Sequence, residues 1–101
     1  MYKIKNYTIN KLNELNKKLN TDKITIKSST DKNKKIDIFI NCVKTNSIGD
    51  INYLDYPTYT EELGIDYANK RRDLYYKRHA NEKDIKDNKI SNSWWAKYLL
   101  W

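Results

Sequence analysis

The spacing of hydrophobic residues changes along the chain, and each change marks a different predicted element. From Ile9 to Leu19 an apolar residue recurs at steps of three and four, which predicts an amphipathic helix over about 8–20 with Thr8 as its cap. Residues 1–7 before it are expected to form an extended arm. Lysine, asparagine and glutamate fill the other side of the helix. We expect it to pack on the core by its apolar stripe, and docking on a partner is the alternative.

Beyond this helix the pattern changes to alternation. Segment 23–27 alternates lysine with isoleucine and threonine, as a half-buried strand does. Segment 35–40 predicts a second strand, with its isoleucines on one face and Asp37 and Phe39 on the other. The polar residues 28–33 between the two segments predict a turn. The two strands are therefore expected to form a hairpin.

The sheet is expected to stay small. A second turn is predicted over 41–46, with weaker strand material at 47–49. Two or three antiparallel strands leave one face for helices to cover, so the predicted fold class is α+β, a hairpin or three-stranded sheet packed with three to four helices. A length of 101 residues fits a single small domain. Its regions are an N-terminal arm and helix, a hairpin region, a tyrosine- and arginine-rich helical region and a tryptophan-rich C-terminal helix, over residues 1–21, 22–49, 50–80 and 91–101.

The tyrosine- and arginine-rich region begins with turn chemistry. Thr58-x-x-Glu61, directly after Pro57, has the pattern of a capping box with Thr58 as the cap. The short helix that it starts is expected to end at Gly64. A longer helix is predicted over about 65–80, and all three arginines of the chain lie on it.

The arginines of this second helix alternate with aromatic residues. At helical spacing Arg71, Tyr75 and Arg78 share one face, and Arg72 and His79 lie on a neighbouring stripe. Two interpretations stay open. In the structural one, the arginines pair with nearby aspartates and stack on tyrosines. In the functional one, they form an exposed basic and aromatic face for phosphates or bases.

The chain ends in a segment rich in tryptophan. A polar linker over 81–90, anchored by Ile85 and Ile90, leads to a helix that is capped within 91–93. As a helix this segment has two apolar faces, which cannot both stay in water. One face is expected to complete the core and the other to meet a second element or a second chain. The residues of this predicted interaction surface are Trp94, Trp95, Tyr98 and Trp101.

Positive charge is concentrated in the first half of the chain. The net charge is +7, and residues 1–49 hold eleven lysines against four acids, whereas residues 50–101 hold nine basic and nine acidic residues. A basic excess favours polyanion partners through counterion release. In the hairpin loop, hydroxyls such as Ser29 stand beside lysines and can meet phosphates, and an ordinary exposed loop is the alternative. The predicted phosphate contacts of this loop are Lys27, Lys32, Lys34 and Lys35.

Metal-binding and catalytic motifs are not apparent. Cys42 is the only cysteine, so it has no disulfide partner within the chain, and it is expected to be half-buried. One histidine and one cysteine do not supply a usual zinc set, so we predict no metal and no cofactor. His79 is interpreted as a structural histidine at a helix end, with a general base of a nuclease-like site as the alternative. No apolar run approaches a membrane span or a signal-peptide core, so neither membrane contact nor secretion is expected.

An ordered set of short motifs resembles a family of viral proteins. The motifs are Ile48-Gly49-Asp50, Tyr53-x-Asp55-Tyr56-Pro57-x-Tyr59, Gly64-x-x-Tyr67-Ala68-x-x-Arg71-Arg72-x-Leu74-Tyr75-x-x-Arg78-His79, Ser93-Trp94 and Leu99-Leu100-Trp101. Over roughly residues 23–101 the chain is similar to short proteins of large DNA viruses of eukaryotes and of some phages, although Ile48 stands where that family has phenylalanine. The resemblance implies a viral setting, in the cytoplasm, nucleus or viral factory of an infected cell or in the virion. It transfers no catalytic residue.

Together these observations predict a small basic viral protein that is not an enzyme and binds nucleic acid mainly through backbone charge. Its contacts are expected to be the hairpin-loop lysines with Arg71, Arg72, Tyr75, Arg78 and His79. The first alternative is a minor virion component or interaction module that uses the tryptophan-rich helix, with a second copy or a virion protein as its partner. The second alternative is a nuclease-like enzyme that uses His79.

Overall fold

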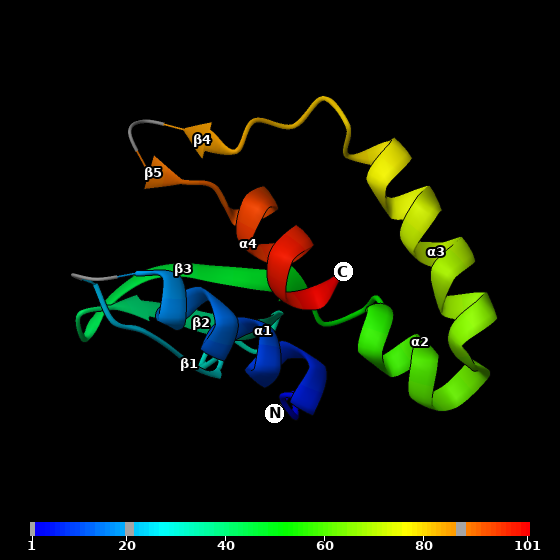
Figure 1. Ribbon diagram of the computed structural model, residues 1–101, viewed down its shortest axis with the longest axis horizontal. Helices are drawn as coiled ribbons and strands as arrows, with labels where there is room; N and C mark the ends of the chain where they lie inside the picture. The colour runs from blue at the N-terminus through cyan, green and yellow to red at the C-terminus, as the bar shows by residue number, and fades with distance from the viewer. Residues whose placement is uncertain (1, 20–21, 87–88) are drawn as a thin grey trace.

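The computed structural model describes residues 2–19, 22–86 and 89–101 (Figure 1). Its helices are α1 (Asn6–Lys18), α2 (Tyr56–Leu63), α3 (Ile65–Arg78) and α4 (Asn92–Leu100). One antiparallel sheet contains, in this order, β1 (Ile24–Ser28), β2 (Lys34–Ile40) and β3 (Val43–Asp50), and a separate two-stranded ribbon contains β4 (Ile85–Lys86) and β5 (Lys89–Ile90). The three-stranded sheet and the helices form one compact domain, which confirms the predicted α+β class.

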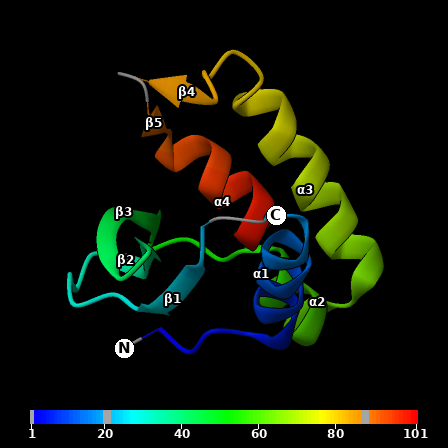
Figure 2. The same cartoon turned by 60° about the vertical axis from the view of Figure 1, so that its left-hand side comes forward.

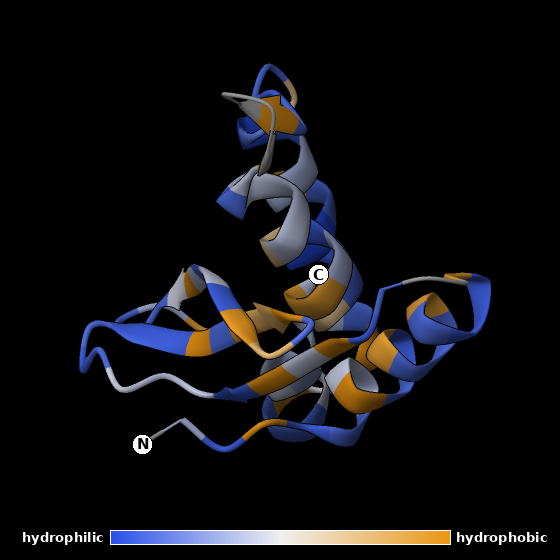
Figure 3. Cartoon of the chain, turned by 90° about the vertical axis from the view of Figure 1, so that its left-hand side faces the viewer, coloured by the Kyte–Doolittle hydropathy of each residue, from blue (hydrophilic) through white to orange (hydrophobic). Residues whose placement is uncertain are grey.

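The sheet buries one face because isoleucines alternate along its strands. Ile26 of β1 lies opposite Ile38 of β2, and Ile36 of β2 lies opposite Ile48 of β3. Ile36, Ile38 and Ile48 are at most 1% exposed. α1 and α4 pack beside this sheet (Figure 2). Coloured by hydropathy, hydrophobic segments of the strands lie close to those of α1 (Figure 3).

The connection between β2 and β3 is tighter than the predicted turn over 41–46. Asn41 and Cys42 have φ angles of 51° and 70°, the positive values that two-residue hairpin turns use. β3 therefore begins at Val43, earlier than the predicted strand at 47–49. Cys42 is exposed, so the expectation of a half-buried side chain is wrong. The tip of a tight turn projects into solvent and offers no neighbours to bury it.

α1 begins at Asn6, and Thr8 lies inside it rather than capping it. The cap position belongs to Lys5, whose side chain makes no capping hydrogen bond. Thr8 is fully buried, and its hydroxyl donates to the carbonyl oxygen of Leu99 at 2.7 Å. That carbonyl is near the C-terminal end of α4, where helix carbonyls lack intrahelical partners. The predicted cap is thus a polar link between two helices.

α2 and α3 are joined at Gly64, as predicted. Its φ of 88° is a value that glycine adopts without the steric cost a side chain would bring. The cap of α2 is Asp55 and not the predicted Thr58, because the Asp55 carboxylate accepts a hydrogen bond from the N–H of Thr58 at 3.0 Å. Pro57 lies in the first turn, where its missing N–H has no helical partner to lose.

α4 supplies much of the core. The Ser91 side chain caps it by accepting from the N–H of Trp94 at 3.1 Å. Trp95 and Leu99 are 0% exposed, and Trp101 is 8% exposed. The structure therefore places Trp95 and Trp101 in the core rather than on the predicted interaction surface. Trp95 is buried because α4 packs against both β3 and α1, and Trp101 is covered by the rings of Tyr75 of α3 and Tyr59 of α2.

The predicted linker over 81–90 contains the β4–β5 ribbon. Ile85 pairs with Ile90 across the ribbon, yet the two are 65% and 38% exposed. They are not the apolar anchors that the sequence suggested. In Figure 1 the ribbon lies above α4 and β3, at the far end of the connection that leaves α3.

Candidate functional site

The predicted phosphate-binding lysines lie in different environments. Lys27 and Lys32 are exposed, and Lys34 is half-buried at the start of β2. Lys35 is 4% exposed, so it is not the surface contact that was predicted. Adjacent residues of a strand point to opposite faces, and this places neighbouring lysines in different surroundings.

Lys35 is buried because it pairs with Asp55. Its Nζ lies 3.0 Å from Oδ2 of Asp55, and the side chains are 5% and 1% exposed. The Tyr2 hydroxyl donates to the same oxygen at 2.6 Å, and the N–H of Thr58 donates to Oδ1. Burial raises the pKa of Asp55, but the Lys35 charge and these hydrogen bonds outweigh it, so the pKa lies below its usual value. The pair joins the N-terminal arm, β2 and α2, and it belongs to the fold.

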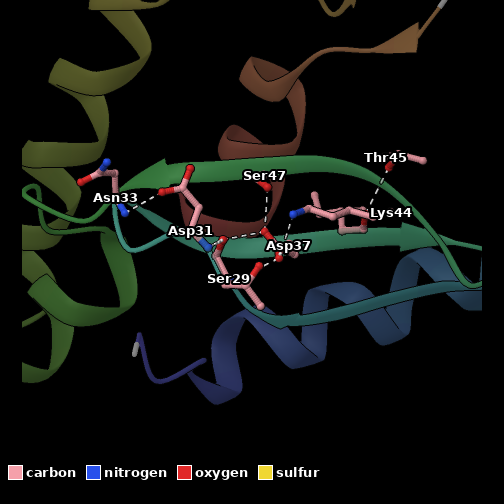
Figure 4. Close-up of polar contacts among 9 residues, drawn as sticks. Ser29, Asp31, Asn33, Asp37, Lys44, Thr45 and Ser47 are labelled. Atoms are coloured by element: carbon pink, nitrogen blue, oxygen red, sulfur yellow. Dashed lines mark hydrogen bonds and ion pairs between the residues drawn. The ribbon is translucent and has the colours of Figure 1, made fainter.

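A second carboxylate cluster uses the hydroxyls of the hairpin region (Figure 4). Asp37 is 2% exposed and accepts hydrogen bonds from the hydroxyls of Ser29 and Ser47 at 2.6 and 2.7 Å. The N–H of Thr30 donates to it, and Nζ of Lys44 lies 3.3 Å away. Burial raises the pKa of Asp37, but these partners together lower it to about 2. Ser29 is therefore occupied inside the protein, and the cluster was not predicted.

The three arginines contact tyrosine rings rather than carboxylates. Within residues 2–19, 22–86 and 89–101, no arginine lies at ion-pair distance from an aspartate or glutamate. The predicted aromatic contacts are present and the predicted pairing with aspartates is not. From guanidinium carbon to ring centre the distances are 3.6 Å for Arg72 and Tyr56, 5.5 Å for Arg71 and Tyr59, and 5.9 Å for Arg78 and Tyr75.

A cleft of about 1260 Å³ lies between α3 and the layer formed by α4 with the sheet. In Figure 1, α3 stands apart from α4 and β3 and is connected to them through α2 at one end and the β4–β5 segment at the other. Arg71 and Arg78 line the cleft from α3, Lys34 lines it from β2, and Lys83 lines it from the segment before β4. Arg72 is not among the lining residues, because it lies over Tyr56.

The charge around the cleft is mainly positive. Among the described residues, and apart from Lys35, whose charge Asp55 balances, four cations line the cleft against two carboxylates, namely Lys34, Arg71, Arg78 and Lys83 against Asp50 and Glu82. One of these carboxylates is already engaged, since Glu82 contacts His79 and Ser93. Nε of Arg71 is covered by neighbouring atoms and has no hydrogen-bond partner in the described part of the chain. The cleft can therefore attract an anionic ligand.

Aromatic side chains form the floor of the cleft. The rings of Tyr75 and Trp101 stack with centres 4.4 Å apart and planes 10° from parallel, and the His79 ring lies 4.2 Å from Tyr75. Burial, helped by the charge of Glu82, raises the pKa of Tyr75 to about 12. Tyr75 is thus part of the core rather than the free contact that was predicted. Among the described residues that line the cleft, Tyr53 is an exposed aromatic residue, at 67%, and it was not among the predicted contacts.

The wall that faces α3 offers amides and hydroxyls. Asn46 lies there on β3, and Ser91, Asn92 and Ser93 lie around the start of α4. The Asn46 side chain donates to Oδ1 of Asn92 at 2.8 Å. One side of the cleft therefore presents guanidinium groups. The other combines the charged Lys34 and Asp50 with amides and hydroxyls that are partly bonded to neighbouring residues.

His79 lies at the cleft rim, just after α3. Its Nδ1 contacts Oε1 of Glu82, and its Nε2 lies 3.4 Å from Nε of Arg78. The second carboxylate oxygen of Glu82 accepts from the Ser93 hydroxyl, so these contacts connect the end of α3 with the start of α4. Among the residues that the structure describes, no group of three or more His, Cys, Asp or Glu side chains is placed to hold a metal ion.

A smaller hollow of about 430 Å³ lies against another side of α4. The half-buried rings of Trp94 and Tyr98 stack there, 5.1 Å apart and 6° from parallel. Nζ of Lys11 lies 5.4 Å from the centre of the Tyr98 ring, and the Tyr98 hydroxyl donates to the carbonyl of Lys11 at 3.0 Å. Of the four residues of the predicted interaction surface, Trp94 and Tyr98 are the two that retain partial exposure.

Comparison of the chain with models of protein families, with curated proteins and with solved structures finds no match. The resemblance to viral proteins stays a prediction. Within the described ranges no helix has both the length and the apolar character that crossing a bilayer requires.

Proposed function

We propose that this chain binds nucleic acid, mainly through phosphate charge, and that it does so at the cleft beside α3. The observation that carries the proposal is the position of Arg71 and Arg78. Both line a cleft in which cations outnumber acids, and neither pairs with a carboxylate in the described part of the chain. A planar guanidinium matches two oxygens of a phosphate or a carboxylate at once, and phosphate is the anion that we propose for this wall.

The residues proposed to contact phosphate differ from the set chosen on sequence. Lys27 and Lys32 stay in the set as exposed cations of the hairpin, and Lys34, Arg71 and Arg78 stay as cleft residues. Lys83 joins them because it lines the cleft. Three residues leave the set because their contacts hold the fold together, namely Lys35, Arg72 and Tyr75.

Binding of this kind requires no reaction, and we propose a protein without catalytic activity. The resemblance adds a viral setting, either in an infected cell or within the virion. The nuclease alternative predicts that incubation with a labelled oligonucleotide and Mg²⁺ yields fragments, and that His79→Ala abolishes them. Cleavage by the wild-type protein that this substitution removes would replace binding with catalysis.

Salt dependence tests the proposal. Fluorescence anisotropy of a labelled mixed-sequence oligonucleotide, single-stranded or duplex, should show binding at 20 mM salt. The logarithm of affinity should fall linearly with the logarithm of salt concentration, because each phosphate contact releases condensed counterions. The six proposed contacts give an expected slope of about −4 for a single strand, at about −0.7 per contact. No binding of either form at 20 mM salt would refute the proposal.

A second candidate function is a protein interaction module, and the exposed apolar residues favour it. Eight of the thirteen large hydrophobic residues found exposed belong to residues 51–76, which include the β3–α2 loop, α2 and most of α3. Of the large hydrophobic residues of α3, Leu74 is the most exposed, at 54%. Such a concentration is typical of a contact surface. It moves the predicted interaction site away from the tryptophan-rich helix.

Light scattering tests this second function. If two copies associate through residues 51–76, the wild-type chain should form a dimer or larger species that Leu74→Asn reduces to a monomer. Ile85→Asn serves as the matched control, since Ile85 is 65% exposed but lies outside this region. A wild-type protein that stays monomeric at high concentration would contradict self-association.

A further inference from the structure

We infer that the cleft accepts a single strand of nucleic acid and discriminates against a duplex. The inference rests on the proposed function and specifies its ligand. At about 1260 Å³ the cleft exceeds the roughly 300–1,000 Å³ of a site for one small molecule. A short stretch of an extended polymer suits such a volume better than a single compact ligand does.

The two walls of the cleft match the two sides of an unpaired strand. Arg71 and Arg78 present charge from α3, whereas the opposite side carries the amides of Asn46 and Asn92, which share one hydrogen bond with each other. An unpaired strand carries phosphates along one edge and exposes the hydrogen-bonding edges and faces of its bases along the other. Phosphates can therefore face α3 while bases face the amides and the exposed ring of Tyr53.

A duplex does not fit this arrangement. It carries its phosphates on the outside and pairs its base edges, so it would have to meet an outward surface of the protein rather than enter the cleft. The exposed outer face of α3 is one such surface, and its charges cancel. At helical spacing this face carries two acids and two lysines, namely Asp66, Asp73, Lys70 and Lys77. The guanidinium groups that could bind phosphate lie on the side of α3 that lines the cleft.

An acidic peptide would also meet the positive charge of the cleft, but it would use fewer of the other groups. A carboxylate side chain has no aromatic face to lie against Tyr53, whereas every base has one, and base stacking on aromatic rings tolerates any sequence. The combination of guanidinium groups, an exposed ring and an amide wall therefore favours nucleic acid over peptide.

The experiment compares a labelled 12-nucleotide single strand with a hairpin duplex of matched composition by fluorescence anisotropy at 50 mM salt. We expect the single strand to bind at least about tenfold more tightly than the duplex. Arg78→Gln should weaken single-strand binding by at least about fivefold and make the salt slope shallower by about 0.7. The matched control is Lys77→Gln, which removes one positive charge from the outer face of the same helix and should change affinity by less than about twofold.

Folding of each variant is checked by its thermal melt, and Lys83→Gln, at an exposed position of the cleft, replaces Arg78→Gln if that variant fails to fold.

Equal or tighter binding of the duplex would overturn the inference and leave phosphate binding in place. Equal losses in the cleft variant and in Lys77→Gln would also overturn it, because charge alone would then explain affinity. Displacement of the strand by polyglutamate at equal charge concentration would assign the cleft to acidic peptides. Absence of binding by both nucleic acids would instead refute the proposed function itself.

Discussion

Charged residues are used in opposite ways in the sheet and in α3. In the sheet, Lys35 is buried and neutralised by Asp55, and Asp37 is surrounded by hydroxyl, amide and ammonium donors. On α3, Arg71 and Arg78 lie near tyrosine rings and have no carboxylate partner among the described residues. Residues 1–49, which include α1 and the sheet, contain the excess of positive charge in the sequence, yet the groups best placed to bind a ligand come mainly from the charge-balanced half.

The difference shows that local charge count is a poor guide to where a ligand binds. A buried charge must be paired and hydrogen-bonded, since desolvation would otherwise make folding unfavourable. A guanidinium held over a ring keeps its hydrogen-bonding edge available, because the aromatic contact uses only its flat face. We therefore expect substitutions in the sheet to change stability and substitutions on the cleft side of α3 to change binding.

The largest effect is expected from Asp55→Ala. The substitution removes the cap of α2, the acceptor for the Tyr2 hydroxyl and the partner of buried Lys35. Breaking a buried ion pair from one side costs about 3–5 kcal/mol. The midpoint of urea unfolding should fall accordingly, with little change in the slope of the transition.

The matched control for that variant is the double substitution Lys35→Met with Asp55→Ala. Without an unpaired ammonium group in the interior, part of the lost stability should return. A double variant no more stable than Asp55→Ala alone would show that the cap and the tyrosine contact, and not the ion pair, dominate at this position.

Acid should destabilise the protein through the same carboxylates. The pKa of Asp37 falls from its usual 3.8 to about 2 in the folded chain, and that of Asp55 is also lowered. A carboxylate with a lowered pKa stabilises the fold above its unfolded pKa and loses that contribution as pH falls. The free energy of unfolding should therefore decline between about pH 4 and pH 2. In Asp37→Asn the free energy of unfolding should be about 2 kcal/mol lower at pH 7 and should decline less steeply in acid. An acid profile identical to that of the wild-type chain would contradict the role of Asp37 in the acid dependence.

The smallest effects on stability are expected from substitutions of the arginines of α3, and they should differ between Arg72 and Arg78. Arg72→Gln should lower the free energy of unfolding by about 1 kcal/mol, because its guanidinium carbon lies 3.6 Å from the Tyr56 ring centre and is half-buried. Arg78→Gln should change it by less than about 0.5 kcal/mol, since Arg78 is exposed. Urea unfolding of the two variants side by side measures both, and the reverse order would contradict the division between fold and cleft.

Much of the fold follows from local pattern. The helical spacing from Ile9 to Leu19, the alternation in β2 and the break at Gly64 each identify their element, because a period or a backbone angle is encoded within a few residues. The exposure of Cys42 at the tip of the turn could not be predicted from local pattern. Its position depends on the register between β2 and β3, which long-range pairing determines.

The site was less accessible from sequence because tertiary contacts decide which charges stay available. Lys34 and Lys35 are neighbours in the chain and both line the cleft, yet Lys34 is only half-buried there, whereas Lys35 is buried and paired with Asp55, twenty residues away. Likewise, Arg71 and Arg72 are neighbours in the chain, but Arg71 lines the cleft and Arg72 lies over the Tyr56 ring. Helical spacing separated Arg71 and Arg78 from Arg72 correctly, but it placed His79, which also lines the cleft, with Arg72, and it could not show which stripe faces a cleft.

The chain has only three arginines, so their side-chain Nε–Hε groups give a simple NMR spectrum that can test the central claim directly. Titration of ¹⁵N-labelled protein with the 12-nucleotide single strand should shift the signals of Arg71 and Arg78, which line the cleft, and leave that of Arg72 in place. Assignment follows from the single Arg-to-Gln variants. Binding that shifts Arg72 alone, or that shifts none of the three, would show that the nucleic acid binds elsewhere and would contradict the cleft as the site.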